Sequence, residues 1–322
     1  MSQYPLHIWS TLPTITTPLS LLGSSAILYV ISRSNDKLST TLNRLLVGLC
    51  VGDIIFSFSM LITKFIVKLE DRGSGPVPGT TNWAACKTQG FLLYAGGHMS
   101  ICYNCALCVY YVCVIKLNYS DTKIKKKVEP FLHAIPWAYA IIFSSCALAT
   151  KSINPGISMC MVAEYRPQDC ESDDCVRGLD YYLKFRLADV SIMIIVFIAI
   201  ILMMTVVYLK VWRQERRMRN AGYRSTNSVR NSGLEVSMIA GRQNQQAQAN
   251  NSFNLSLRLS LRKNVTNSRK VLNQAMAYAG AYLATWIFYI CSVLIILFGG
   301  DSVTIALIAT FVGPLQGKSQ MR

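Results

Sequence analysis

The chain has 322 residues, 52% of them apolar, with a mean hydropathy of +0.33 and a formal net charge of +16. So high a charge would suit a nucleic-acid partner, but the basic residues gather in alternate loops between apolar runs, which excludes that role. Each apolar run is about 20 residues long, enough to cross a hydrocarbon layer of ~30 Å. The composition and its pattern therefore predict an all-α, polytopic protein embedded in the lipid bilayer.

Seven apolar runs follow one another along the chain, and each predicts a transmembrane helix. They cover residues 8–31, 42–67, 88–115, 132–150, 187–211, 271–298 and 302–315. The third run is the most polar, so we expect it to lie inside the bundle rather than against lipid. The seventh run is short and weak. The predicted fold is a seven-transmembrane helix bundle with a short seventh helix.

The distribution of basic residues predicts the orientation. The loops after the first, third and fifth runs hold 21 Lys and Arg, whereas the other loops are balanced or acidic. Cytoplasmic loops collect Lys and Arg, so we expect an extracellular N-terminus. Because no organelle leader is visible, the expected location is the plasma membrane, with an internal membrane as the alternative. The loop after the fifth run is rich in Gln, Asn, Ser and Arg with few aromatics, which predicts disorder. The expected regions are an extracellular N-terminus 1–7, helices one to five in 8–211, the disordered basic loop 212–268, helices six and seven in 269–317, and a cytoplasmic stub 318–322.

Four of the 11 cysteines fall on the predicted extracellular side: Cys86, Cys160, Cys170 and Cys175. An even number of cysteines in an oxidising compartment indicates disulfides. We favour one bridge between the first two and one between the last two, but spacing alone leaves all three pairings open. The other cysteines lie in or beside the apolar runs, where Cys is usually a packing residue. No metal site is predicted, because no histidine is suitably spaced beside them.

Two sets of polar residues lie at membrane depth, where an ionisable side chain costs at least ~2.5–3.5 kcal/mol on insertion scales. Asp53, near the middle of the second run, is expected either to bond a neighbouring helix or to take part in ion binding or switching. With it we group two further residues as a polar core, Asn104 and Gln316. The second set is expected to line a ligand pocket, with interhelical bonding or packing as the alternative: Gln89, Tyr94, His98, Asp189 and Trp286.

Short motifs occur in a consistent order along nearly the whole chain. They are Asn43-Arg-Leu-Leu-Val-Gly-Leu-Cys-Val-Gly-Asp53, Cys86-Lys-Thr-Gln-Gly-Phe91, Tyr103-Asn104, Glu129-Pro130-Phe-Leu-His133, Cys175-Val-Arg-Gly178 and Pro314-Leu-Gln-Gly317. In these motifs the chain resembles seven-transmembrane receptors that couple to G proteins, specifically the secretin-like and cyclic-AMP-receptor-like group and most closely receptor-like proteins of diatoms and related algae. The Asp-Arg-Tyr and Asn-Pro-x-x-Tyr motifs of rhodopsin-like receptors are absent, which favours that group.

The resemblance implies a disulfide between Cys86 and Cys160, an unknown extracellular ligand and a heterotrimeric G protein as partners. It also implies that the G protein meets the cytoplasmic ends of helices three, five and six. The basic residues expected there are Lys116, Lys125, Lys126, Arg213, Arg217 and Lys270. Such receptors continue for several helical turns where this chain stops, five residues after Gly317, so a truncated last segment is expected.

Other functions are less compatible with the sequence. No catalytic set, phosphate-binding glycine loop or His-Glu-x-x-His motif is present, so we expect neither an enzyme nor a cofactor. A transporter or channel is the alternative, but it predicts internal repeats and several charges along a path, and we find one midplane acid and no repeat. A retinal photoreceptor needs a lysine in the seventh helix, and residues 302–315 contain none.

Overall fold

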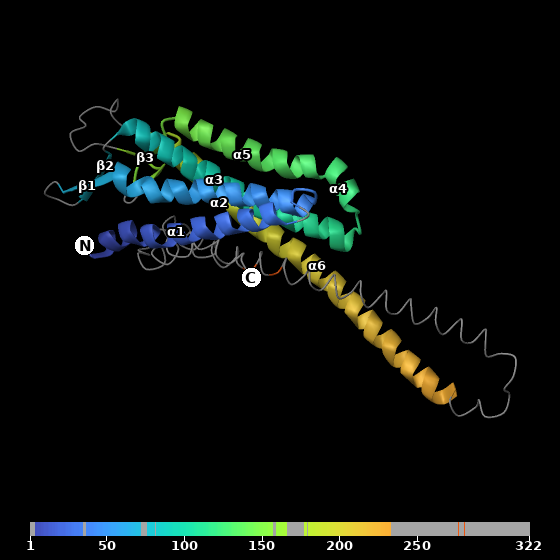
Figure 1. Ribbon diagram of the computed structural model, residues 1–322. Coiled ribbons are helices and arrows are strands. Elements are labelled where there is room, and N and C mark those ends of the chain that lie inside the picture. The colour runs from blue at the N-terminus through green and yellow to red at the C-terminus, as the bar shows by residue number, and fades with distance from the viewer. Residues whose placement is uncertain are drawn as a thin grey trace.

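The computed structural model describes residues 4–34, 37–71, 76–80, 82–156, 159–165, 177–178 and 180–232, together with Met276 and Gly280. Helices dominate this part of the chain (Figure 1). They are α1 (Tyr4–Arg33), α2 (Thr41–Ile66), α3 (Trp83–Tyr111) continued by the π-helical segment η1 (Val112–Lys116), α4 (Asp121–Lys127), α5 (Glu129–Ala149) and α6 (Tyr182–Ser232).

The first five predicted apolar runs correspond in order to α1, α2, α3 with η1, α5 and α6. Four segments within the described residues have the length and composition to cross a membrane: Thr41–Thr63, Trp83–Lys116, Glu129–Ala149 and Tyr182–Arg217. The predicted sixth and seventh helices, 271–298 and 302–315, lie outside the part of the chain that is described. The first helix begins at Tyr4, so it takes up residues that were assigned to the extracellular N-terminus.

Two short antiparallel hairpins lie at one end of the bundle (Figure 1). In the first, β1 (Val67–Asp71) pairs with β2 (Pro76–Thr80), and in the second, β3 (Ile153–Pro155) pairs with β4 (Cys160–Val162). The second hairpin packs against α3. We call this the hairpin end of the bundle, and the opposite end, where α4 lies, the α4 end. The sequence did not predict the hairpins, because strands this short leave almost no periodic signal.

The third helix occupies the centre, as its polar content predicted, and it contacts α2, α5 and α6. Its approach to α2 is close because both helices carry glycine there. A Cβ atom on Gly96 would lie 2.4 Å from the backbone nitrogen of Phe56, and one on Gly52 would lie 3.0 Å from the Cβ of Met99. Only glycine therefore permits this backbone spacing.

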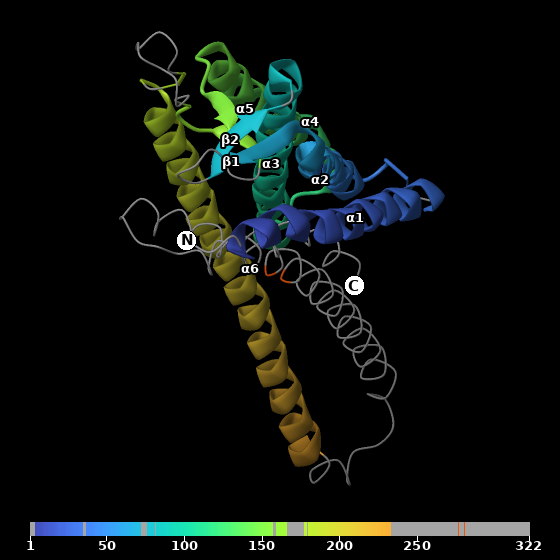
Figure 2. The ribbon, with the colours of Figure 1, turned by 90° about the vertical axis from the view of Figure 1, so that its left-hand side faces the viewer.

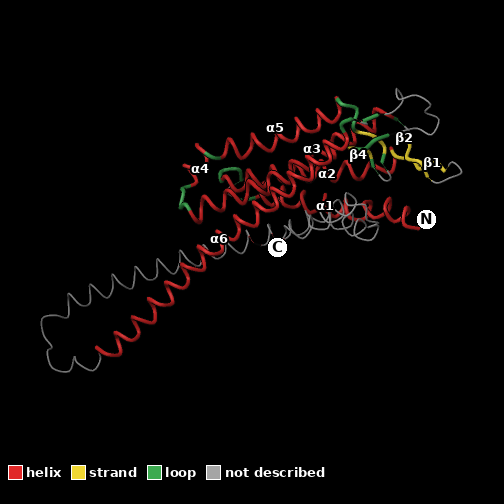
Figure 3. Tube along the Cα trace, turned by 180° about the vertical axis from the view of Figure 1, so that it is seen from behind, coloured by secondary structure: helices red, strands yellow, loops and turns green. Residues whose placement is uncertain are grey.

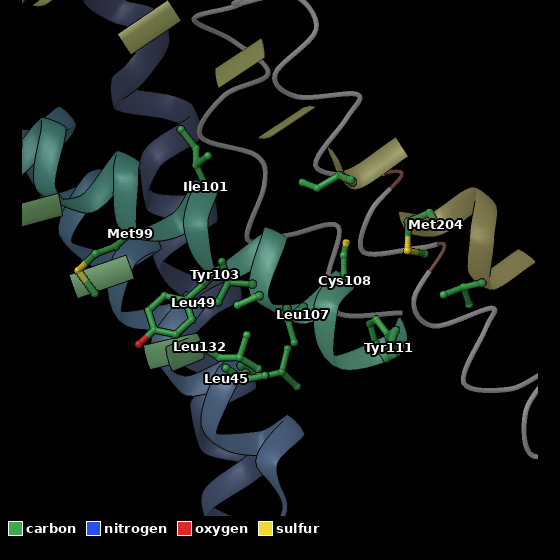
Figure 4. Close-up of a cluster of buried hydrophobic side chains, with 14 of the residues drawn as sticks. Leu45, Leu49, Met99, Ile101, Tyr103, Leu107, Cys108, Tyr111, Leu132 and Met204 are labelled. Atoms are coloured by element: carbon green, nitrogen blue, oxygen red, sulfur yellow. The ribbon is translucent and has the colours of Figure 1, made fainter. Parts of the chain in front are cut away.

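The apolar core lies between α2, α3, α5 and α6, and Figure 4 shows its central part. Leu45, Leu49 and Leu107 are almost fully buried there. From α6 the core receives a single stripe of buried side chains at helical spacing: Met193, Ile200, Met204, Val207 and Val211. The opposite side of α6 exposes large apolar residues such as Ile195 and Leu202, as expected of a surface that faces lipid.

The α6 helix, which corresponds to the fifth predicted transmembrane helix, continues well beyond the bundle (Figures 2 and 3). Its 51 residues span about 76 Å at 1.5 Å per residue, more than twice the hydrocarbon thickness. Residues 212–232, which were predicted to belong to a disordered loop, form the last part of this helix. After Trp212, residues 213–218 are all Arg, Gln, Glu or Met, strong helix formers that prolong the preceding helix.

Candidate functional site

A disulfide joins Cys86 in the first turn of α3 to Cys160 at the start of β4. Both residues are fully buried. This is the bridge that the resemblance implied, and it fixes the second hairpin across the top of α3. The predicted partners Cys170 and Cys175 lie outside the described residues.

Gln89 holds the same hairpin from one turn further along α3. Its Nε2 donates to the carbonyl oxygen of Ser59 at 3.3 Å and to Oγ1 of Thr63 at 3.2 Å, and its Oε1 accepts from the backbone nitrogen of Cys160 at 3.0 Å. The side chain is fully buried. These bonds match the interhelical bonding expected as the alternative to a pocket role for Gln89, and they tie α2, α3 and β4 together.

His98 and Asp189 form a buried polar pair between α3 and α6. The Nε2 atom of His98 lies 2.9 Å from Oδ1 of Asp189, and its Nδ1 lies 2.7 Å from the carbonyl oxygen of Tyr94. A carbonyl can only accept, so Nδ1 carries a hydrogen. The second bond then joins either an imidazolium to a carboxylate or a neutral imidazole to a carboxylic acid. In both forms one proton is shared between the two helices.

Aromatic rings surround this pair. The ring of His98 stacks on Tyr94, and it lies 5.0 Å from the ring of Tyr139 and 4.4 Å from that of Phe143. The hydroxyl of Tyr139 is buried and has no hydrogen-bond partner within the described residues. We call these five residues the His98 cluster: Tyr94, His98, Tyr139, Phe143 and Asp189.

The His98 cluster has the chemistry of a small-molecule site. An apolar and aromatic lining with a few convergent polar groups is typical of such sites. The structure brings together three of the predicted pocket residues, Tyr94, His98 and Asp189, while Trp286 lies outside the described residues. Sequence reasoning missed Tyr139 and Phe143, although two aromatic residues four positions apart on one predicted helix could have indicated a shared face.

Asp53 lies in a second buried polar group, between α2 and α3. Its Oδ1 accepts a hydrogen bond of 2.6 Å from the hydroxyl of Ser100. The backbone carbonyl oxygen of Ser100 in turn accepts a hydrogen bond of 2.9 Å from Nδ2 of Asn104. The other carboxyl oxygen of Asp53 is buried without a hydrogen-bond partner in the described part of the chain. An unsatisfied buried group of this kind is costly and requires an explanation. Gln316, predicted to join this core, lies outside the described residues.

A third polar group, which the sequence analysis missed, lies at the α4 end. The guanidinium of Arg44 makes bidentate contact with the carboxyl group of Glu129, to which Oγ1 of Thr41 also donates at 2.8 Å. Alongside, the hydroxyl of Tyr103 lies 2.9 Å from Nδ1 of His133. We call Thr41, Arg44 and Glu129 the Glu129 cluster. Its signal in the sequence was an isolated acid next to a run of lysines.

The residues expected to face a G protein are exposed where they are described. Lys125 and Lys126 lie on α4, Lys116 ends η1, and Arg213 and Arg217 lie on α6. Lys270 is outside the described residues. The α4 helix is held in place by Ile124, which is fully buried. Its Asp121 also accepts from the backbone nitrogen of Thr41 at 3.4 Å.

Comparison with known proteins gives a consistent result. Residues 23–312 match the sequence model of the 7 transmembrane receptor (rhodopsin family). The crystal structure of squid rhodopsin is similar with a TM-score of 0.59 at 14% identity, over 99% of this chain and 82% of that one, which concerns the fold alone. No curated protein matches the sequence. Neither match confirms the secretin-like and cyclic-AMP-receptor-like grouping or the algal affinity that the motifs favoured.

Proposed function

Because the chain belongs to the rhodopsin family of seven-transmembrane receptors, we propose that it binds an extracellular ligand at the His98 cluster and signals to a heterotrimeric G protein. The observation that carries this proposal is the buried pair of His98 and Asp189, which joins α3 to α6 among aromatic rings. A ligand that alters this pair changes the contact between two helices that both run to the α4 end. The family membership does not favour the alternative of a transporter or channel.

The chemistry of the His98 cluster defines the kind of ligand. It offers an acid and an imidazole that share one proton, and the hydroxyl of Tyr139, which has no described partner. A small molecule with an apolar or aromatic body and at least one hydrogen-bonding group fits such a lining. That group would bond Tyr139 and compete with His98 for Asp189.

The path to the cytoplasmic side runs along α6. This helix packs on the core through one stripe of Met, Ile and Val side chains, which adapt to a small shift better than bonded polar groups do. A ligand that binds one arrangement of α6 more tightly shifts the population toward it. The arrangement is then read at the α4 end by the proposed G-protein-facing residues: Lys116, Lys125, Lys126, Arg213, Arg217 and Lys270.

Asp53 and Asn104 act in this proposal as the polar core of the switch, together with Gln316. The bond from Ser100 uses one carboxyl oxygen of Asp53, and the other has no described partner. A group that binds this oxygen in only one state of the bundle would stabilise that state.

The proposed location is the plasma membrane, with the hairpin end and the N-terminus outside the cell. Disulfides form and persist on the oxidising side, which supports placing the Cys86–Cys160 bridge there. The Lys-rich α4 would then face the cytoplasm, in accord with the orientation rule. Antibody against an N-terminal epitope tag should stain intact cells, and staining that requires permeabilised cells would contradict this orientation.

The function is tested by measuring nucleotide exchange on a panel of purified G-protein heterotrimers with the full chain in lipid nanodiscs. We expect at least one heterotrimer to exchange faster than with empty nanodiscs. We also expect His98→Phe, which keeps an aromatic ring but removes both polar atoms, to change that rate. Cys146→Ser, at an exposed free cysteine of α5, is the matched control and should leave it unchanged. The proposal would be refuted if no heterotrimer exchanged nucleotide faster with the chain than with empty nanodiscs.

A further inference from the structure

A groove of about 570 Å³ lies at the hairpin end, between α3 and the end of α5. Its lining residues are Ala84, Lys87, Thr88, Phe91, Leu148 and Lys151. None of them belongs to the His98 cluster. Phe91 precedes Tyr94 of that cluster by three residues, about 4.5 Å along the helix axis, so the groove adjoins the cluster without sharing a residue with it. The proposed function makes no use of the groove.

The lining of the groove is amphipathic. Phe91 and Leu148 supply an apolar surface, and Lys87 and Lys151 supply two ammonium groups. Neither ammonium has an ion-pair or hydrogen-bond partner among the residues that the structure describes. Two positive charges beside apolar surface are complementary to an anion that carries a hydrocarbon chain.

The backbone at Lys151 supports a role for this side chain. Thr150 caps α5, and Lys151 follows it with a φ of 57°, in the left-handed region. This position after a helix usually holds glycine, which adopts the conformation at no steric cost. A lysine here accepts backbone strain, and strained positions of this kind concentrate at binding and functional sites.

The neighbouring surface places the groove against lipid. The α5 helix exposes Ile141 and Ile142 shortly before Leu148, and such large apolar side chains are expected to face the hydrocarbon layer. An occupant can therefore enter from the membrane, with its chain among the lipid tails. The groove also has the volume of an ordinary small-molecule site.

We propose that this groove binds a long-chain fatty acid from the surrounding leaflet. Its carboxylate would lie between the ammonium groups of Lys87 and Lys151, and its chain along Phe91 and Leu148. The carboxylate needs no third protein partner, because the groove opens to water at the end of the bundle and solvent completes its hydration.

The test uses the purified full chain in nanodiscs of neutral phosphatidylcholine and palmitic acid that carries a diazirine near its carboxyl group. After illumination, mass spectrometry maps the labelled residues. Labelling should fall on residues 84–91 and 148–151, and unlabelled palmitic acid should compete whereas hexadecanol should not. Equal competition by hexadecanol would overturn the proposal, since it would show apolar partitioning without recognition of the anion.

Matched variants locate the site. The double variant Lys87→Gln with Lys151→Gln should reduce labelling by about 2- to 25-fold, because each exposed ion pair contributes a factor of about 1.4 to 5. Lys184→Gln, which removes an exposed lysine near the same end on α6, should have no effect. Ala84→Leu fills the groove and keeps both charges, so it should also reduce labelling.

Two results would refute the fatty-acid assignment. If labelling is unchanged in both the double lysine variant and Ala84→Leu, the probe binds elsewhere. If labelling disappears in nanodiscs that contain phosphatidylserine, a phospholipid headgroup is the preferred occupant. Circular dichroism and retention of the disulfide confirm in each case that the variant is folded.

Discussion

The central helix α3 makes two very different contacts. Toward α2, the glycine-lined approach at Gly96 and the bonds of Gln89 and Ser100 leave almost no freedom, because polar atoms and backbone are matched across the interface. Toward α6, the described contact consists of an apolar stripe and the pair of His98 and Asp189. One interface is specified by backbone fit, and the other by side chains that can repack.

The difference shows which part of the receptor can move. The helices α2, α3 and α5 form a fixed unit, which the disulfide and the Glu129 cluster hold at its two ends. The α6 helix lies against this unit and extends far beyond it (Figure 2). Shifts of 1–2 Å between packed helices are a common form of switching, and a long helix carries such a shift away from the ligand. The following predictions test the two interfaces, starting with the largest expected effect.

Removal of the disulfide should cause the largest loss of stability. The double variant Cys86→Ser with Cys160→Ser should lower the free energy of unfolding by about 2–4 kcal/mol, because the bridge closes a long loop of the unfolded chain. The sequence separation of the two cysteines is 74 residues. Thermal unfolding of the purified protein measures the effect, and Cys146→Ser is the control without a bridge. An unchanged melting temperature would show that the hairpin is held by other contacts.

Gly96→Ala should be the next most damaging change. The new methyl carbon would lie 2.4 Å from the backbone nitrogen of Phe56, so α2 and α3 must separate, at a cost of about 1–3 kcal/mol. Gly97→Ala is a closely matched control, since its methyl would lie 3.5 Å from the side chain of Phe56. Alanine also favours a helix by up to about 1 kcal/mol over glycine, so the control should be neutral or stabilising. Chemical unfolding measures the stability of both variants. Coinciding unfolding curves for Gly96→Ala and Gly97→Ala would contradict the fixed interface between α2 and α3.

These two interfaces also show what the sequence could predict. The order and approximate positions of five helices followed from apolar run length, which is local information. The central position of α3 followed from its polar residues, and the disulfide from a family resemblance. The role of Gln89 did not follow, because a glutamine that lines a pocket and one that bonds a backbone carbonyl of α2 look alike until the rotation of both helices is known.

Pairings between distant helices were missed for the same reason. Arg44 and Glu129 lie 85 residues apart, and nothing in either local sequence indicates that their ends meet. Asp189 was predicted to be a pocket residue, but its pairing with His98 depends on the depth at which α6 crosses α3. The relative depth and rotation of two helices are set by how they pack together, so the sequence of either helix alone does not determine them.

Glu129→Gln should have a moderate effect on the fixed unit. It leaves the guanidinium of Arg44 without its carboxylate, and a charged hydrogen bond of this kind is worth about 1–2 kcal/mol. The double variant with Arg44→Gln should lose less stability than the sum of the single variants, because the second change removes the uncompensated charge. Unfolding of all four proteins completes the cycle. Strictly additive losses would show that the two side chains do not interact.

Asp189→Asn should have the smallest effect on stability and a clear effect on signalling. The amide of asparagine can still donate to Nε2 of His98, so the bond between α3 and α6 survives and the free energy of unfolding should change by only about 0.5–1 kcal/mol. The shared proton is lost, because an amide cannot exchange a proton with the imidazole, so basal nucleotide exchange on the responsive G protein should change. If the variant is instead as destabilised as Gly96→Ala, the contact with α6 is as rigid as that with α2. In that case the movable helix must be sought elsewhere in the receptor.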